Sequence, residues 1–207
     1  GVTAENLVET TAQHHNAKGA VALVLGAGNI AAISPLDVLH KVFSENQVVI
    51  LKMNPVNDYL ADYLTAALRP LIDLNALRIV RGGGDVGAYL CNHDLVQEIH
   101  ITGAAATHDK IVWGDDTMRI TPKLTKRITS ELGGVGPTIV VPGPWSARDL
   151  AYQAENIATQ KLHNSGFNCI ACQMLILPRD WAQKSALMDN LARVIANAPP
   201  RGAYYPG

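Results

Sequence analysis

Cysteine, aromatic residues and net charge are all scarce in this chain of 207 residues. It has three cysteines, only 5% of its residues are aromatic, and its formal net charge is −1. Three thiols are too few for a disulfide framework and indicate a reducing compartment, so we expect a cytoplasmic location. Because the chain has no basic excess to neutralise phosphates, a nucleic-acid partner is not expected.

Long apolar runs and targeting segments are also missing. No run approaches the roughly 20 apolar residues that span a bilayer, so no membrane span is expected. No cationic leader precedes an apolar segment. Hydrophobic residues still make up 48% of the chain, enough for a sizeable core. The chain opens at Gly1 without a methionine and closes on a Pro- and Gly-rich segment, from which we expect a piece of a longer protein.

Short runs rich in Val and Ile alternate with longer amphipathic stretches. The short runs predict buried strands over residues 20–25, 48–52, 77–81, 98–102, 137–141 and 173–178. The amphipathic stretches predict helices near residues 35–45, 57–72, 85–92, 148–164 and 180–197, the first capped by Ser34 before Pro35. This alternation predicts an α/β fold, with a parallel sheet covered by helices on both faces. The polar residues 114–126 predict a loop, and the glycines near 131–136 a change of domain.

Glycine-rich turns follow three of the predicted strands. The first two contain G-x-G-x-x-A at Gly26, Gly28 and Ala31, and G-x-G-x-x-G at Gly82, Gly84 and Gly87. Such glycines allow a phosphate to approach a helix N-terminus closely at the carboxyl edge of a parallel sheet. An acidic residue about 20 positions after the first motif should hold a ribose hydroxyl, but that strand ends in Lys52. Glycine turns without a ligand remain the alternative.

Two further positions precede or follow such turns. Thr102 and Gly103 end the fourth predicted strand and could offer backbone N–H groups to a phosphate. Glu131 stands just before a glycine turn. It is either an exposed cap residue or a general base with room to move.

The stretch HNSGFNCIAC, residues 163–172, contains two cysteines at C-x-x-C spacing. A structural zinc site needs a second pair of ligands, which the chain does not offer. A redox pair would open a helix, whereas this pair runs into a predicted strand. On that strand Cys169 and Cys172 would point to opposite faces, which argues against a disulfide. Two inert buried cysteines, or one reactive Cys169 with Cys172 in the core, are the readings left open.

Taken in chain order, these segments resemble the aldehyde dehydrogenase superfamily over nearly all 207 residues. The segments are the turn at Asn29, VVILKMNP, GGGDVG, ITG, SELGG and NSGFNC. The resemblance implies a Rossmann-like NAD(P)-binding domain over residues 1–131 and the first part of an α/β catalytic domain over 132–207. It also assigns catalytic roles: Cys169 matches the nucleophile, Glu131 the general base, and Asn29 the amide that helps to hold the oxyanion.

The same resemblance assigns residues to a cofactor, which would be NAD or NADP. Lys52 matches the lysine that holds the adenosine ribose, and Thr102 and Gly103 match the turn over the nicotinamide half. The remaining matches to cofactor-binding positions are Gly84, Gly87 and Leu132. The implied substrate is a small aldehyde or acyl thioester, no metal is implied, and the full-length parent is expected to form a homo-oligomer.

The chain departs from the family pattern at several positions. Phe167 replaces a glutamine in the cysteine motif, and Ala104 replaces a serine in the turn after ITG. Pro55 stands where a glutamate commonly selects NAD, so NADP stays open. Ala27 and Gly28 replace the proline–aromatic pair before the oxyanion asparagine. These departures indicate a divergent branch in the direction of the acyl-CoA reductases.

The expected activity is NAD(P)-dependent oxidation of an aldehyde to an acid or acyl thioester through a cysteine thioester. An acyl-CoA reductase that forms an aldehyde is one alternative. A nucleotide-binding module without turnover is the other.

Overall fold

A computed structural model describes residue 3 and residues 19–204 of the chain. The chain divides into two compact units, Gly1–Leu132 and Gly133–Gly207, and each is described by itself. The first unit thus ends after Leu132, whereas the sequence places the change of domain after Glu131. Gly1 and the last three residues of the Pro- and Gly-rich segment, both cited for a longer protein, lie outside the described residues.

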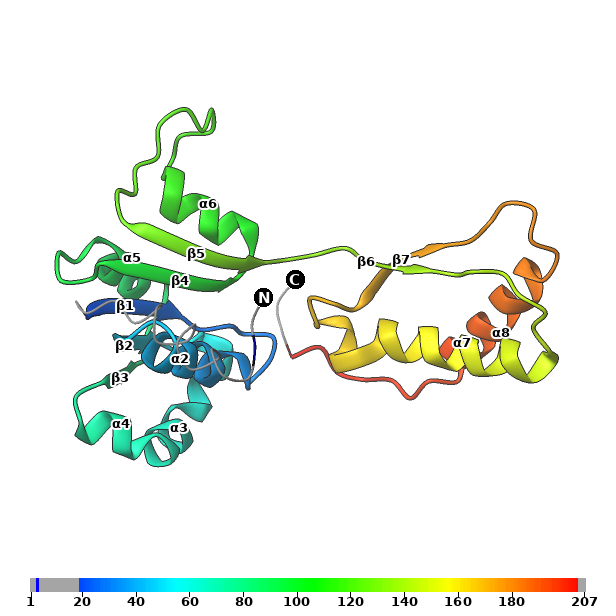
Figure 1. The fold of residues 1–207 in the computed structure, drawn as a ribbon, viewed down its shortest axis with the longest axis horizontal. Helices are drawn as coiled ribbons and strands as arrows, with labels where there is room; N and C mark the ends of the chain where they lie inside the picture. Colours follow the sequence, from blue (N-terminus) through cyan, green and yellow to red (C-terminus); the bar gives the residue numbers. More distant parts are fainter. Residues whose placement is uncertain (1–2, 4–18, 205–207) are drawn as a thin grey trace. The chain divides into compact units, whose positions relative to one another are not determined.

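The described part of the first unit is built on a five-stranded sheet with the spatial order β3-β2-β1-β4-β5 (Figure 1). All four neighbouring pairs are parallel. The chain therefore begins in the middle of the sheet, builds one half outward, and then returns to build the other half. The strands are β1 (Ala20–Leu25), β2 (Gln47–Lys52), β3 (Leu77–Val80), β4 (Glu98–Gly103) and β5 (Arg127–Leu132).

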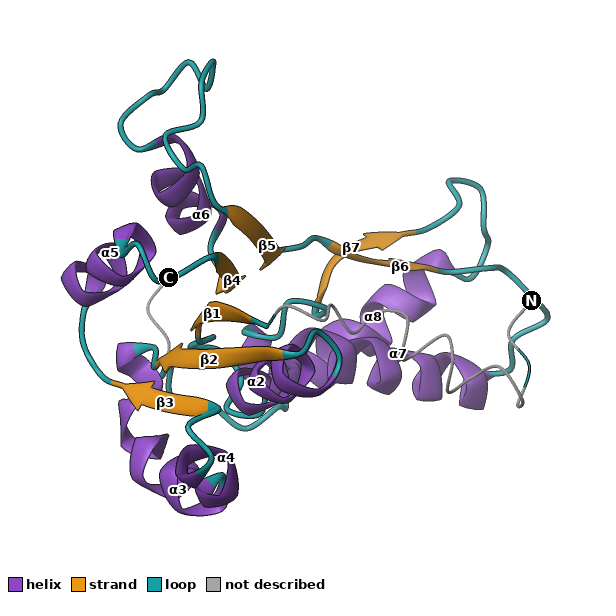
Figure 2. Ribbon diagram, turned by 60° about the vertical axis from the view of Figure 1, so that its left-hand side comes forward, coloured by secondary structure: helices purple, strands orange, loops and turns teal. Residues whose placement is uncertain are grey.

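Helices cover both faces of this sheet (Figure 2). On one face lie α2 (Ile33–Phe43), the 3₁₀ helix η1 (Pro55–Leu60), α3 (Ala61–Ala67) and α4 (Arg69–Asp73). On the other face lie α5 (Gly84–Asn92) and α6 (Ala105–Trp113). The predicted α/β class, with a parallel sheet between two helical layers, is confirmed.

Alternate residues of β1 supply two separate cores, because successive side chains of a strand point to opposite faces. Ala22 and Val24 pack with Val38 of α2 on one face. Leu23 packs with Cys91 of α5 on the other. Burial of each large apolar side chain contributes about 1.5–3 kcal/mol, so both layers hold the sheet in place.

Two helix predictions are wrong in detail. Ser34 does not cap α2, because the helix begins one residue earlier at Ile33, and the Ser34 hydroxyl is buried with no hydrogen-bond partner in the described chain. The single helix expected near residues 57–72 is three short helices. Pro70 explains the second break, since a proline has no N–H to donate and is tolerated only in the first turn of a helix, where it lies in α4.

The strand β5 is absent from the sequence prediction. Its residues, RITSEL, include four polar ones, and none of the six is buried. A strand at the sheet edge need not carry the Val- and Ile-rich run that marks the central strands. The loop predicted over residues 114–126 is confirmed and leads directly into β5.

The second unit, as far as it is described, has a two-stranded parallel sheet packed on two helices. Its elements are β6 (Gly136–Ile139), α7 (Ala147–Leu162), the 3₁₀ helix η2 (His163–Gly166), β7 (Cys172–Ile176) and α8 (Lys184–Ala196). Ser146 and Asp149 form a reciprocal capping box at the start of α7. Trp145, just before α7, and Trp181, between β7 and α8, meet edge to face with their ring centroids 4.9 Å apart. Both pack against the core of this unit.

Candidate functional site

The carboxyl edge of the five-stranded sheet collects all the site residues predicted in the first unit. Lys52 ends β2 beside Leu25 of β1. At the other side of β1, Thr102 of β4 is in register with Glu131 of β5, and Gly103 with Leu132. The turn with Asn29 follows β1, and the first residues of α5, with Gly84 and Gly87, follow β3 at the same edge.

Asn57 holds the turn that carries Asn29. Its buried side-chain amide donates to the backbone oxygens of Ala27 at 3.0 Å and Gly28 at 3.2 Å. Gly26 is also constrained, because an added Cβ would lie 2.6 Å from the Ser34 hydroxyl. The turn is therefore fixed from both sides, and Asn29 is half-buried at its end.

The glycines after β3 differ in how strictly their position requires glycine. Gly82 has a φ of +142°, and an added Cβ would meet Val86 at 2.5 Å, so this position requires glycine. A Cβ on Gly84 would meet nothing within 4 Å, and one on Gly87 only Leu25 at 4.0 Å. Packing therefore does not require glycine at Gly84 or Gly87, and the space beside Gly84 is open.

Lys52 is only 7% exposed, at the end of β2. Burial lowers the pKa of its ammonium, while the charges of Asp58 and Asp85 act in the opposite direction. Neither carboxylate forms a hydrogen bond with this ammonium. The end of β2 thus holds a buried cation among carboxylates that act on it only through their charge.

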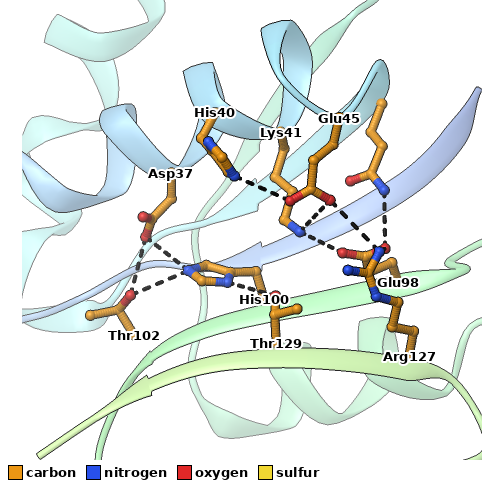
Figure 3. Close-up of polar contacts among 10 residues, drawn as sticks. Asp37, His40, Lys41, Glu45, Glu98, His100, Thr102, Arg127 and Thr129 are labelled. Carbon is orange, nitrogen blue, oxygen red and sulfur yellow. Dashed lines mark hydrogen bonds and ion pairs between the residues drawn. The ribbon is translucent and has the colours of Figure 1, made fainter. Parts of the chain in front are cut away.

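A row of polar side chains runs along β4 and β5 beneath α2 (Figure 3). The Thr102 hydroxyl donates to Asp37 of α2 at 3.2 Å. His100 lies 3.5 Å from the same carboxylate oxygen and shares a 2.8 Å hydrogen bond with Thr129. Asp37 and His100 carry no motif and are not predicted from the sequence. They hold the hydroxyl of Thr102 toward α2.

Glu131 is exposed and lies two residues after Thr129 on β5, so the two side chains share a face of the sheet. Its neighbour across the register is Thr102. Gly133 and Gly134 follow, with no helix or strand until Gly136. The carboxylate at residue 131 therefore lies on the α2 face of the carboxyl edge.

Cys169 lies in the second unit, in the loop between η2 and β7. It is exposed, whereas Cys91 and Cys172 are buried, and all three thiols are free. The expected placement of Cys169 and Cys172 on opposite faces of one strand is wrong, because β7 begins only at Cys172. The conclusion that they do not form a disulfide is confirmed.

Asn168 organises the loop around Cys169. Its oxygen accepts from the Ile170 N–H at 3.1 Å and from the Cys169 thiol at 3.7 Å. Its nitrogen donates to His163 at 2.7 Å. Three consecutive residues before it have positive φ, namely Asn164, Ser165 and Gly166. Phe167, which replaces the family's glutamine, packs edge to face on Tyr204, with the ring centroids 5.3 Å apart.

The described residues contain neither a metal-binding cluster nor a membrane-spanning helix. Within residues 19–204, no three His, Cys, Asp or Glu side chains are grouped so as to hold a metal ion. None of the helices in the same range combines the length and apolar character needed to cross a bilayer.

Comparison with known proteins decides the family. The sequence profile of the aldehyde dehydrogenase family matches residues 8–199. This chain belongs to that family. The resemblance noted from the motifs is therefore confirmed over almost the whole sequence.

Curated relatives agree with this assignment. The dimeric NADP-preferring aldehyde dehydrogenase of Mus musculus is 29% identical over 157 residues, which cover 76% of this chain and 32% of that protein. Aldehyde dehydrogenase family 3 member F1 of Arabidopsis thaliana is 26% identical over 174 residues, covering 84% of this chain and 34% of the relative. The chain thus spans about a third of the length of the curated relatives it matches.

Solved structures of the family have the same fold. An NAD-dependent aldehyde dehydrogenase from Sinorhizobium meliloti is 25% identical, with a TM-score of 0.66, and covers 85% of this chain and 33% of its own. An aldehyde dehydrogenase from Mycobacterium tuberculosis complexed with NAD+ has a TM-score of 0.71 at 19% identity, over 87% of this chain and 35% of its own. The second likeness concerns the fold alone.

Proposed function

We propose that this chain supplies the nucleotide-binding and thiol-bearing parts of an NAD(P)-dependent aldehyde dehydrogenase that works through a cysteine thioester. The observation that carries the proposal is the exposure of Cys169, alone among the three cysteines, in a motif that resembles the one around the family's nucleophile. The other two thiols are buried, Cys91 in the core beneath α5 and Cys172 at the start of β7. The substrate class is a small aldehyde.

Cys169 begins the reaction. As a thiolate it attacks the aldehyde carbon, the carbon–sulfur bond forms, and the carbonyl electron pair moves to oxygen. Asn29, on its turn held by Asn57, is the proposed side-chain donor to that oxyanion, with the Cys169 N–H as the second. A preorganised donor of this kind is worth about 3–4 kcal/mol in comparable sites. The bound nicotinamide cofactor would accept the hydride that turns this adduct into a thioester.

Glu131 completes the cycle as the general base. It takes a proton from water, the water oxygen bonds to the thioester carbon, and the carbon–sulfur bond breaks to release the acid and the thiolate. The exposed position of Glu131 before two glycines supports this role, since the carboxylate has room to move. If coenzyme A accepts the acyl group instead, Glu131 is not needed for the transfer.

The carboxyl edge of the first unit fits a dinucleotide cofactor. Lys52 at the end of β2 and Thr102 at the end of β4 lie two strands apart in the sheet, roughly 10 Å at the usual spacing. Open sheets bind ligands at this edge, near the strands where the chain reverses its direction of winding, here β1 and β4. The space over Gly84 lies on the β3 side of the same edge. Lys52 would hold the adenosine ribose, and Thr102 and Gly103 would face the nicotinamide half.

The decisive experiment is a turnover assay on the protein that carries this chain, with aldehyde-dependent reduction of NAD and NADP as readout. Cys169→Ala should abolish turnover and leave cofactor affinity unchanged. Cys172→Ala, at a buried thiol three residues away, is the matched control and should stay active. Turnover by Cys169→Ala at the wild-type rate would refute the proposal.

The direction of the reaction has its own test. Glu131→Gln should still form one equivalent of reduced cofactor per site and then stop, because the thioester cannot be hydrolysed. If the protein instead oxidises NAD(P)H with an acyl thioester, and Glu131→Gln leaves that rate intact, the reductase alternative replaces aldehyde oxidation. Alkylation of Cys169 no faster than of Cys91, with cofactor bound, would favour the module without turnover.

The homo-oligomer and the cytoplasmic location expected from the sequence stay predictions.

A further inference from the structure

A carboxylate that belongs to none of the family motifs, that of Asp58, lies close to the end of β2. Asp58 lies on η1, which follows Lys52 after a short extended link. The start of η1 is fixed, because Asn54 accepts from the Val56 N–H at 3.0 Å and Pro55 occupies the first turn. Asp58 is therefore held at a defined place beside the end of the strand.

One oxygen of Asp58 lacks a protein partner. Its Oδ1 is buried and accepts no hydrogen bond within the part of the chain that the structure describes. A buried carboxylate oxygen without a donor is costly for a folded protein and persists when a ligand supplies the donor. The charge of Asp58 reaches Lys52, which it does not hydrogen-bond.

A sugar diol satisfies both groups at once. The Lys52 ammonium can only donate, and the Asp58 carboxylate can only accept. A ribose hydroxyl does both, because its oxygen accepts from an ammonium while its hydrogen is donated to a carboxylate. Dinucleotide-binding sheets use an acidic residue near the end of the second strand for the 2′-hydroxyl. In this chain Pro55 occupies the position where the family commonly has that acid.

The surrounding charges oppose a phosphate on the same hydroxyl. Asp58 and Asp85 both lie close enough to act on Lys52. The nearby Arg81 pairs with the exposed Asp62 at 3.0 Å and donates to the Asp58 backbone oxygen at 3.3 Å. A 2′-phosphate would bring about two negative charges close to Asp58 and Asp85, and like-charge repulsion disfavours it.

We propose that Asp58 binds the 2′-hydroxyl of the adenosine ribose together with Lys52, and that it makes this chain select NAD over NADP. Asp58 is thus a specificity-determining residue that replaces the acid missing at Pro55. The inference rests on the proposed function, and it differs from the cofactor preference named for the Mus musculus relative, which is NADP-preferring.

The test is a titration of the 207-residue chain with NAD and NADP, and with ADP-ribose and its 2′-phosphate as probes of the adenosine half. NAD should bind at least about tenfold more tightly than NADP. Asp58→Asn should lower NAD affinity by about tenfold, the usual loss for a hydrogen bond to a charged group. It should also bring the NAD/NADP ratio close to one, because it removes the repulsion of the phosphate. The thermal midpoint should not fall, since the variant removes a buried charge.

Asp73→Asn is the matched control, because it removes the same charge from an exposed carboxylate that pairs with Arg69 and not with Arg81. It should change the NAD/NADP ratio by less than about threefold, as expected for an exposed charge. Preference for NADP in the wild-type chain, or an unchanged ratio in Asp58→Asn, would overturn the inference and leave the proposed function standing. If neither nucleotide nor either probe binds, both this inference and the proposed function are refuted. Loss of turnover in Cys169→Ala is independent of this result.

Discussion

The two edges of the five-stranded sheet each contain a buried lysine, and the two lysines have opposite surroundings. At the amino edge, Lys41 is 2% exposed and bonds Glu98 at 2.5 Å and Glu45 at 2.9 Å (Figure 3). At the carboxyl edge, Lys52 is 7% exposed and meets carboxylates only through their charge. The first lysine is paired within the fold, and the second forms no hydrogen bond or ion pair in the described part of the chain.

The pKa values follow this difference. Burial alone would raise the pKa of Glu98, but hydrogen bonds from Lys41 and Gln47 and the charges of Lys41 and Arg127 hold it below its ordinary value. Burial lowers the pKa of Lys52, and the charges of Asp58 and Asp85 do not cancel the effect. The paired charges at the amino edge therefore stabilise the fold, whereas the buried, unpaired ammonium at the carboxyl edge costs stability.

The largest expected effect comes from breaking the amino-edge network. Glu98→Ala leaves the buried Lys41 with Glu45 alone, and we expect it to lower the free energy of unfolding by about 3–5 kcal/mol. Urea denaturation measures this change. The double variant Lys41→Met with Glu98→Leu should lose less, about 1–3 kcal/mol, because it removes both charges together but still leaves the buried Gln47 amide without its acceptor. A loss below about 1 kcal/mol in Glu98→Ala would contradict the assigned role.

The next effect concerns the turn at the carboxyl edge. Asn57→Ala leaves the oxygens of Ala27 and Gly28 unpaired, which should cost about 1–3 kcal/mol by the same denaturation assay. Asn92→Ala removes a similar hydrogen bond, from a side-chain amide to a backbone oxygen, at an exposed helix position. It should cost less than about 0.5 kcal/mol. In the catalytic assay, Asn57→Ala should reduce kcat more than it raises KM for the cofactor, since Asn29 is the group it positions. Equal stability losses in the two variants would argue against a special role for Asn57.

Lys52→Met separates binding from stability. Because burial lowers the pKa of Lys52 and no hydrogen bond links its ammonium to Asp58 or Asp85, the variant should unfold within about 1 kcal/mol of wild type. Its affinity for NAD should fall by about tenfold, equivalent to about 1.4 kcal/mol. Calorimetric titration and denaturation of the same sample give both values. A stability loss as large as that of Glu98→Ala would remove the contrast between the two lysines.

The smallest effect is the pH dependence of the amino edge. The pKa of Glu98 is lowered in the folded protein, so its ionised form stabilises the fold above the ordinary glutamate pKa of about 4.3. That contribution is lost as the pH falls through the lower folded value. The difference in unfolding free energy between wild type and Glu98→Gln should be constant from about pH 5 to 7 and shrink in more acidic buffer. A difference that grows as the pH falls would have the wrong sign.

Particular residues show how far sequence reasoning reaches. The central strands were predictable because their Val- and Ile-rich runs must be buried on both faces. Strand β5 was not, because an edge strand can remain polar and still complete its backbone hydrogen bonds. Family motifs contain Cys169, Glu131 and Lys52, so these residues could be found from the sequence. No motif contains Asp37, Asn57 or Asp58. The sequence indicates them only by their position near a strand end or on the helix above it.

The sequence by itself determined the α/β class, the alternation of strands and helices, and the family. Periodicity and short motifs are local properties of the sequence, so they can be recognised without knowledge of the fold. Only the tertiary structure decided that Lys41 is paired while Lys52 is not, and that Asp58 has an oxygen without a donor. The reason is physical: whether a buried charge finds a partner depends on side chains brought from distant parts of the chain, such as Glu98 to Lys41.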